Sequence, residues 1–215
     1  WRYFASCGPR YLFPRVGLAT LSAVDALKGS GAYLDNPCCG LLAHNYGELS
    51  DARELAKKNI EHAEKNGVEP IVGDCSSCVA FLKTYPQLFL KPEDAQWRER
   101  AEAFSKRIKD AIEIYGESAD KLPAGTAGPE TTYHDSCRAT HGQGLKNEPR
   151  RAAKTAAGAS YCEMPGADAC CGGAGAFGFV HGELSEELLK KKVGSAASVQ
   201  AGLILTSSTS CLIQL

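Results

Sequence analysis

The sequence predicts an α/β fold made of two pseudo-symmetric repeats, each with a small parallel sheet flanked by helices. A Cys-Cys-Gly tripeptide occurs twice, at 38–40 and 170–172, and further cysteines surround each copy at similar distances. In each half, short apolar segments alternate with longer amphipathic ones, which is typical of strands and helices around a parallel sheet. The repeat length of about 130 residues exceeds the roughly 20–50 residues of a solenoid unit, so we interpret it as a duplicated domain.

The cysteines of the two repeats have nearly the same spacing. One cysteine precedes the first cysteine of each tripeptide by 31 or 33 residues. A closing segment, C-x-x-C in the first repeat and S-x-x-C in the second, begins 36 or 37 residues after the second cysteine of the tripeptide. The first repeat contributes Cys7, Cys38, Cys39, Cys75 and Cys78, and the second contributes Cys137, Cys170, Cys171 and Cys211. Ser208 replaces the first cysteine of the second closing segment. Of the ten cysteines only Cys162 lies outside the pattern, and we expect it to be a buried apolar thiol.

The first repeat is predicted to alternate strands and helices. Pro14 suits the first turn of a helix, and Gly29 ends the apolar pattern that follows it. Ser50 is a good N-cap, and Gly67 is a C-terminal stop, for the next long helix. In chain order we expect a strand at 2–6, a helix at 14–28, a strand at 32–34, a helix at 50–66, a strand at 70–73 and a helix at 77–85.

A connecting segment follows, and the second repeat returns to the same order. Residues 92–115 have apolar side chains on one face and predict one long charged helix, followed by a Gly-, Pro- and Ala-rich loop at 116–130. We then expect a strand at 131–134, a polar loop at 138–148, a helix at 149–157, a strand at 160–164, a helix at 185–200 and a buried strand at 203–206. The predicted domains are 1–90 and 131–215, with 91–130 as the connector.

Each cysteine group is predicted to lie at the end of a strand or in the turn after it. In open parallel sheets this carboxyl edge is where ligands bind. Structural zinc and a cubane [4Fe–4S] cluster each take four protein ligands, so the five thiols of the first repeat exceed both needs. A larger or opened iron–sulfur cluster, and zinc with one spare thiol, are both open at this point. The four thiols of the second repeat suit zinc or a cubane equally well.

Composition excludes several classes of function. The formal net charge of −1 provides no general attraction to nucleic acid or anionic lipid. There is no run of 18 apolar residues, so we expect no transmembrane segment. The chain begins Trp-Arg-Tyr, without a signal peptide or an initiator Met, and we expect a fragment of a cytoplasmic protein. A disulfide framework is typical of shorter secreted chains, so metal ligation explains the cysteines better.

The spacing of the cysteines and several flanking segments carry a family resemblance. These segments are Phe13–Thr20, Tyr85–Phe89, Tyr133–Cys137, Glu148–Arg151 and Cys170–Gly175. The chain resembles the CCG cysteine-rich domain, which occurs in one of the subunits of heterodisulfide reductase, in the glycolate oxidase iron–sulfur subunit and in lactate-utilisation iron–sulfur oxidoreductases. The segments are most similar to the lactate and glycolate branch.

The resemblance implies an electron-transfer protein. It implies a noncubane [4Fe–4S] cluster on the five cysteines of the first repeat. The second repeat departs from that motif at Ser208, so a second [4Fe–4S] cluster on four thiolates, or zinc, is expected there. The implied partners are flavin-containing or other iron–sulfur subunits of a lactate- or glycolate-type 2-hydroxy-acid oxidoreductase complex. Any association with a membrane would be through such a partner.

Two other functions remain as alternatives. The first is a disulfide reductase subunit of the heterodisulfide-reductase type, acting at a noncubane cluster. The second is a zinc-bound structural scaffold without redox work. We assign no catalytic residue, and whether the chain is itself an enzyme stays open.

Other signals have a simpler explanation than function. The G-x-G-x-x-G match at 173–178 follows no apolar strand, so we interpret its glycines as allowing backbone N–H groups to approach cluster sulfurs. We interpret His44 as a structural histidine, with metal ligation as the alternative. We interpret His134 and His141 as strand and loop histidines, with contacts that support the metal ligands as the alternative. Lys190–Lys192 is interpreted as a solvated helix face, with docking of an acidic partner as the alternative.

Overall fold

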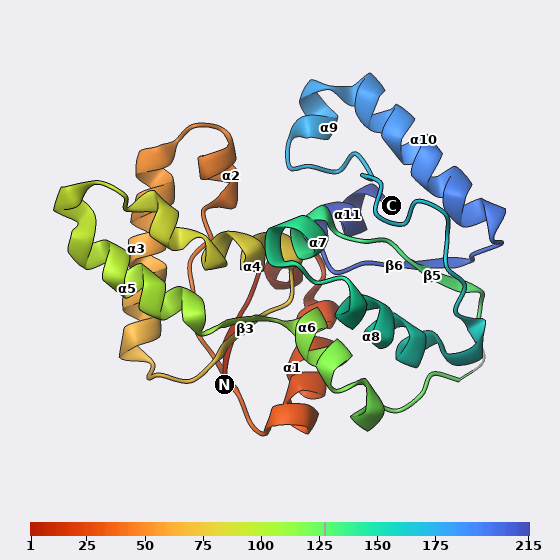
Figure 1. Cartoon of the computed structure of the whole chain (residues 1–215), viewed down its shortest axis with the longest axis horizontal. Helices are drawn as coiled ribbons and strands as arrows, with labels where there is room; N and C mark the ends of the chain where they lie inside the picture. The colour runs from red at the N-terminus through yellow and green to blue at the C-terminus, as the bar shows by residue number, and fades with distance from the viewer. Residues whose placement is uncertain (127) are drawn as a thin grey trace. The chain divides into compact units, whose positions relative to one another are not determined.

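The computed structural model describes residues 1–126 and 128–215, which form two compact units, Trp1–Ala111 and Ile112–Leu215 (Figure 1). Each unit contains parallel strands flanked by helices, so the predicted fold class is confirmed. The division between the units falls inside the segment predicted as a connector. None of the helices in the described residues combines the length and the hydrophobicity of a membrane-spanning segment.

The first unit contains a four-stranded parallel sheet in the order β2-β1-β3-β4. Its strands are β1 (Arg2–Phe4), β2 (Ala32–Tyr33), β3 (Ile71–Gly73) and β4 (Ile108–Asp110). Its helices are α1 (Pro14–Lys28), α2 (Leu41–Asn45), α3 (Leu49–Lys65), α4 (Ser76–Lys83) and α5 (Ala95–Lys106), with short turns η1 (Gly8–Leu12), η2 (Tyr85–Leu88) and η3 (Pro92–Asp94). Tyr3 of β1 lies opposite Tyr33 and Val72, which places the ends of β1 and β3 side by side.

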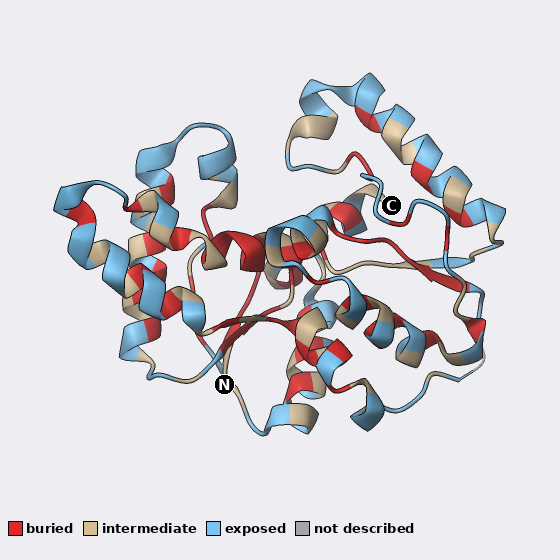
Figure 2. Cartoon of the chain, viewed as in Figure 1, coloured by how far each residue is buried: buried red, intermediate tan, exposed pale blue. Residues whose placement is uncertain are grey.

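The core of this unit lies around α4 and the central strands (Figure 2). Val79, Phe81 and Leu82 of α4 are buried, and each such side chain contributes about 1.5–3 kcal/mol of hydrophobic stabilisation. Tyr85 stacks on Phe104 with 5.4 Å between the ring centroids. Since Cys75 and Cys78 flank the start of α4, this packing gives their thiols a rigid support.

The prediction of one long helix at 92–115 is wrong. Helix α5 ends at Lys106, and Ile108–Asp110 instead form β4, which pairs with β3 from Ile71 to Gly73. The chain then turns into α6 (Ala111–Glu117). The apolar residues that suggested one helix face are shared between α5, which buries Phe104, and the strand, which buries Ile108. Pairing with β3 satisfies backbone groups that an unpaired β3 would leave exposed at a sheet edge.

The second unit repeats the central strand pair. Tyr133 of β5 (Thr131–Tyr133) lies opposite Leu205 of β6 (Leu203–Leu205), as Tyr3 lies opposite Val72 in the first unit. The remaining elements are η4 (Ala119–Lys121), α7 (Cys137–Gln143), α8 (Asn147–Ala157), η5 (Gly158–Ser160), α9 (Phe177–Val180), α10 (Gly182–Ser198) and α11 (Thr209–Gln214). The sheet has two strands in the described residues, so the repeats are less symmetric than predicted.

Three local predictions for this unit are corrected. The expected loop at 138–148 begins as helix α7, which buries Ala139 and ends at Gly144 in the left-handed region. The expected strand at 160–164 makes a single bridge, because the Met164 N–H donates to the Thr132 hydroxyl rather than to a neighbouring strand. Strand β6 is not buried, since Leu203 is 46% exposed. The predicted loop at 116–130 includes residue 127, which lies outside the described residues.

Candidate metal centres

The first site lies at the carboxyl ends of β1 and β3. Cys7 follows β1, Cys75 follows β3, and Cys78 lies in the first turn of α4. The Cys78 thiol is within hydrogen-bonding reach of the thiols of Cys39, Cys7 and Cys75, and Cys38 reaches Cys39. The structure therefore brings all five predicted cysteines into one group. All ten cysteines lie in the described part of the chain, and none forms a disulfide.

The group has a buried side and an exposed side. Cys39, Cys75 and Cys78 are buried, whereas Cys7 and Cys38 are exposed to solvent. Gly40 has φ +86°, in the left-handed region that favours glycine, and its N–H donates to Cys38 Sγ at 3.4 Å. Such N–H donors stabilise thiolates and are one lever on the reduction potential of a bound cluster.

The contacts between the thiols shift their pKa values in opposite directions. Hydrogen bonds from Cys38 and Cys78 hold the pKa of Cys39 well below its ordinary value. The contacts with Cys39, Cys7 and Cys75 and its burial raise the pKa of Cys78. A hydrogen bond from Cys78 lowers the pKa of Cys7 to about 7, although burial opposes this shift. A bound metal would replace the remaining protons, because metals bind cysteine as the thiolate.

A buried hydrogen-bond network fixes the backbone of the Cys38-Cys39 turn. The Tyr85 hydroxyl donates to the Cys39 carbonyl oxygen at 2.7 Å, and Asn59 Nδ2 donates to the Cys38 carbonyl oxygen at 2.9 Å. Asn59 Nδ2 also donates to the Tyr85 hydroxyl at 3.0 Å. The side chains of Asn59 and Tyr85 are fully buried. The network therefore holds the backbone that carries the Cys38 and Cys39 thiols from the interior of the unit.

We expect Tyr85→Phe to lower the free energy of unfolding by about 1–3 kcal/mol, because the Cys39 carbonyl loses its buried donor. Tyr11→Phe is the matched control, since Tyr11 is 73% exposed and its loss of a hydroxyl should change stability by less than about 0.5 kcal/mol. Urea denaturation of the two variants measures the difference. Equal stabilities would show that the network does not hold the turn.

The second site has the same arrangement of cysteines, except that a serine replaces one of them. Cys137 and Cys170 are exposed, and Cys171 and Cys211 are buried, as are their counterparts in the first repeat. Gly172 has φ +87°, and its N–H donates to Cys170 Sγ at 3.4 Å. A Cβ at Gly172 would lie 2.7 Å from the Ser185 carbonyl oxygen, so this turn requires glycine. The buried position of Cys75 is taken by Ser208.

The four cysteines of this site lie close enough to interact, although only two of them are in direct contact. Cys171 is within hydrogen-bonding reach of Cys211, and their interaction lowers the pKa of Cys171 to about 4 and raises that of Cys211. Cys137 lies within electrostatic range of Cys170 and Cys171, and burial is the main cause of its raised pKa. The Gly173 N–H also contacts Cys171, in line with the expected role of the glycines that follow the tripeptide.

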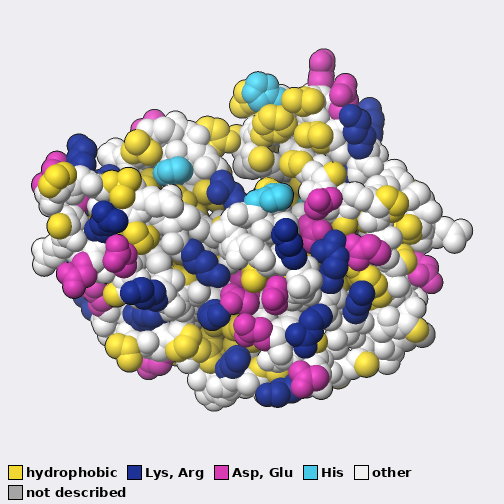
Figure 3. Space-filling model, in the orientation of Figure 1, with side chains coloured by type: hydrophobic (Ala, Val, Ile, Leu, Met, Phe, Trp, Pro, Cys, Tyr) yellow, Lys and Arg dark blue, Asp and Glu magenta, His cyan; other side chains and the backbone are white. Residues whose placement is uncertain are grey.

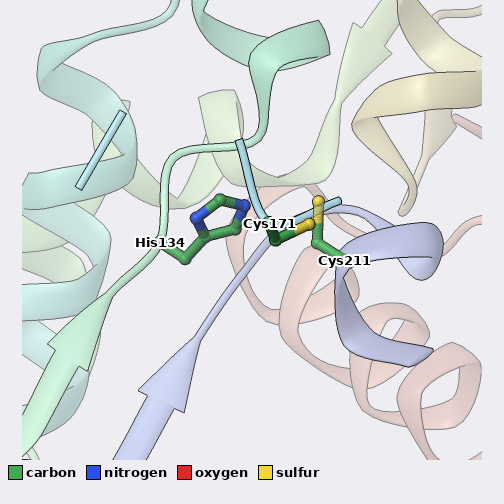
Figure 4. A group of neighbouring side chains, drawn as sticks. All are labelled: His134, Cys171 and Cys211. Atoms are coloured by element: carbon green, nitrogen blue, oxygen red, sulfur yellow. The ribbon is translucent and has the colours of Figure 1, made fainter. Parts of the chain in front are cut away.

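Sequence reasoning underestimated His134. The structure places its imidazole beside Cys171 and Cys211, with one ligand atom of each residue within 4.8 Å of the others, and all three residues are buried (Figure 4). Its position directly after the strand β5 was the signal available in the sequence. His44 and His141 are exposed, and His44 instead packs at 5.0 Å from the Phe81 ring.

Lys192 and Cys162 also differ from expectation. Lys192 is not on a solvated face, since it is 2% exposed and its Nζ donates to the carbonyl oxygens of Gly166 and Ala167 at 2.7 and 3.0 Å. Burial lowers the pKa of Lys192. Electrostatic attraction to the nearby Cys171 and Cys170 opposes this shift. Cys162 is only partly buried, and its thiol lies near two carbonyl oxygens rather than in an apolar core.

We expect Lys192→Met to destabilise the chain by about 1–3 kcal/mol, because two carbonyl groups in the segment before the Cys170-Cys171 turn lose a donor. Lys191→Met provides the control, since Lys191 is exposed on the same helix. Thermal unfolding of both variants measures the effect. A loss of stability in Lys191→Met as large as in Lys192→Met would contradict the assignment.

Two clusters of cysteines, each at the carboxyl ends of parallel strands, define a duplicated cysteine-rich metal-binding protein. The chain belongs to the family described as CCG, cysteine-rich domain, whose model matches residues 1–83 and 131–215. These two segments contain all nine cysteines of the repeated pattern.

The similar proteins are named as iron–sulfur and lactate-utilization proteins. The chain is 33% identical over 217 residues to a "Probable glycolate oxidase iron-sulfur subunit" of Bacillus subtilis (strain 168), covering 99% of this chain and 48% of that protein. It is 29% and 30% identical to "Lactate utilization protein A" of Exiguobacterium sp. and of Oceanobacillus iheyensis, covering 99% of this chain and 86% of each relative. The chain thus spans about half of the first relative and most of the other two.

Proposed function

We propose that this chain is an iron–sulfur electron-transfer subunit of a lactate- or glycolate-type 2-hydroxy-acid oxidoreductase system. The observation that carries the proposal is the convergence of five thiols at one sheet edge, with Cys78 in reach of three of them. The names of the relatives support the iron–sulfur character and the class of substrate. When bound, the cluster would supply one-electron redox chemistry.

The donor set fits a cluster in the first repeat. Five thiols exceed the four that a cubane or a structural zinc needs, which favours a noncubane [4Fe–4S] cluster on Cys7, Cys38, Cys39, Cys75 and Cys78. The chain's own contribution is to hold the thiols, to direct the Gly40 N–H at a sulfur and to keep water from three of the five ligands. The second repeat would hold a further [4Fe–4S] cluster or zinc on Cys137, Cys170, Cys171 and Cys211.

Exposed apolar side chains support a role as a subunit. Phe179 and Val180 on α9 are 93% and 68% exposed, and hydrophobic side chains gather over this helix (Figure 3). In the first unit, Leu42 and Tyr46 are exposed shortly after the Cys38-Cys39 turn. Apolar surface that closely follows the cysteine turns in the sequence is suited to docking a partner, for which we propose a flavin-containing or another iron–sulfur subunit.

Electron transfer can be tested with purified partners. We expect the anaerobically reconstituted chain to accept electrons from a lactate- or glycolate-reduced flavoprotein, observed as bleaching of the cluster absorption near 400 nm. A chain that carries its cluster and is reduced by dithionite, but by neither flavoprotein, would contradict the proposed donor class.

The exposed Cys7 and Cys38 favour a disulfide reductase as the second candidate, because they leave the first site open to a substrate. Turnover of an organic disulfide with a reduced dye would identify this activity, and its absence would leave electron transfer alone. A chain that binds zinc but no iron would instead be the structural scaffold.

A further inference from the structure

The two repeats differ at two positions near the second site, and His134 occupies one of them. Tyr133-His134-Asp135-Ser136-Cys137 aligns with Tyr3-Phe4-Ala5-Ser6-Cys7, so His134 stands where the first repeat has Phe4. Ser208 stands where the first repeat has Cys75. Compared with the first repeat, the second has therefore lost a thiol after one central strand and gained an imidazole after the other.

The two exchanged positions are structurally equivalent. Phe4 and His134 are each 1% exposed, and Cys75 and Ser208 are 2% and 3% exposed. Both Cys75 and Ser208 have extended backbone directly before a helix, α4 in one repeat and α11 in the other. Because β1 pairs with β3, and β5 with β6, the two positions lie at the carboxyl ends of neighbouring strands in each unit. A ligand gained at one strand end can thus replace a ligand lost at the next.

We propose that His134 is a metal ligand and that the second repeat is a mixed nitrogen–sulfur site for a single zinc-type divalent ion. Its ligands would be His134, Cys171 and Cys211, with one of the exposed thiols Cys137 and Cys170 in the fourth position. The proposal deepens the metal site assigned to the second repeat under the proposed function and rests on it.

Distance and chemistry support a single ion. The ligand atoms of His134, Cys171 and Cys211 all lie within 4.8 Å of one another, and one ring nitrogen points toward the two sulfurs (Figure 4). Ligands about 2.0–2.3 Å from one tetrahedral ion lie about 3–4 Å apart, whereas the thiolates of a cubane bind different irons and are further separated. Zinc binds cysteine and histidine together in structural sites, whereas a hydroxyl such as that of Ser208 is a poor partner for a thiolate-bound metal.

Apolar packing alone does not account for this histidine. The Nδ1 atom of His134 is buried and has no hydrogen-bond partner in the part of the chain that the structure describes. Leaving a buried polar atom without a partner costs about 1–3 kcal/mol. Phe4 shows that an apolar side chain fits the same position in the first repeat without this cost. What keeps an imidazole at this position must therefore act at the other ring nitrogen, which faces the sulfurs and is within hydrogen-bonding reach of the Cys171 thiol, and this is where a metal bond would form.

The test titrates the whole metal-free chain with Co²⁺ alone, which occupies zinc-type sites and reports thiolate ligation by its absorption. Four forms are compared: the unchanged chain, His134→Ala, His141→Ala, and the double variant His134→Ala/Ser208→Cys. We expect His134→Ala to weaken Co²⁺ binding at one of two sites by at least about 100-fold, since loss of a supporting residue alone costs about 10–100-fold. His141→Ala, the exposed control, should leave both sites unchanged.

The double variant and the unchanged chain make the test independent of folding defects. Ser208→Cys gives the second repeat the thiol that the first repeat has at Cys75. We therefore expect it to recover Co²⁺ binding in the His134→Ala background. In the unchanged chain, bound Co²⁺ should produce a hyperfine-shifted, exchangeable imidazole N–H resonance in the proton NMR spectrum. If Co²⁺ fills both sites of the unchanged chain without that resonance, and equally fills both sites of His134→Ala, the inference is overturned. If the unchanged chain binds no Co²⁺ at the second repeat, the metal site assigned there under the proposed function has failed.

Discussion

Replacing Cys39 by serine is expected to remove all of the iron bound by the first repeat. Cys39 is 5% exposed and in contact with both Cys38 and Cys78, so its thiolate would be a central ligand of the cluster. A serine hydroxyl is a poor ligand for the soft metals that thiolates select. Cys38→Ser should have the same effect, because Cys38 is the adjacent ligand in the turn. Iron and acid-labile sulfide per chain, measured after anaerobic reconstitution, give the result.

The control for these variants is Cys162→Ser, which changes the one cysteine outside both groups. It should retain the full iron and sulfide content of the unchanged chain. Metal bound by the second repeat should persist in Cys39→Ser, since its ligands lie in a separate compact unit. Unchanged iron content in both Cys38→Ser and Cys39→Ser would show that the ligands are assigned incorrectly.

Arg150→Met is expected to lower the free energy of unfolding by about 3–5 kcal/mol. Both guanidinium NH groups of Arg150 bind the two carboxylate oxygens of Asp135, at 2.9 and 2.7 Å, and the Asp135 side chain is 3% exposed. The variant leaves that carboxylate buried without its counter-charge, two residues before Cys137. Because Asp135 lies in the segment that links β5 to α7, a weakened second metal site should accompany the loss of stability.

A matched surface pair separates this effect from the loss of any arginine. Arg98 and Glu102 form an exposed pair one helical turn apart, with side chains 51% and 47% exposed. Arg98→Met should therefore change stability by less than about 1 kcal/mol. Urea denaturation of both variants provides the comparison. Similar losses in the two variants would mean that the buried pair with Asp135 contributes no more than a surface pair.

The sequence predicted the fold where local and long-range signals agree. The strand at 70–73 is apolar and bounded by turn residues, and β3 occupies nearly the same positions. The helix at 92–115 was wrong because the spacing of apolar residues on a helix also matched a short strand, and only pairing with β3 distinguishes Ile108–Asp110 as β4. The strand at 160–164 was wrong because a side-chain acceptor, the Thr132 hydroxyl, interrupts the ladder.

Cysteine spacing predicted which thiols come together, but not what surrounds them. Tandem tripeptides and strand ends were sufficient to group Cys7 with Cys78, and Cys171 with Cys211. The role of Lys192 depends on carbonyl oxygens of Gly166 and Ala167, which are some 25 residues away in the sequence and give no pattern. His134 was interpreted as an ordinary strand histidine, because its proximity to Cys211 is created by the pairing of β5 with β6.

Metal and sulfide analysis combined with EPR on anaerobically prepared protein tests the central claim most directly. We predict about four irons per chain at the first repeat, with matching acid-labile sulfide and an EPR signal that changes on oxidation or reduction. The line shape would then distinguish a cubane from a noncubane cluster. Zinc alone, with no iron or sulfide after anaerobic reconstitution, would contradict an electron-transfer function and support a structural scaffold.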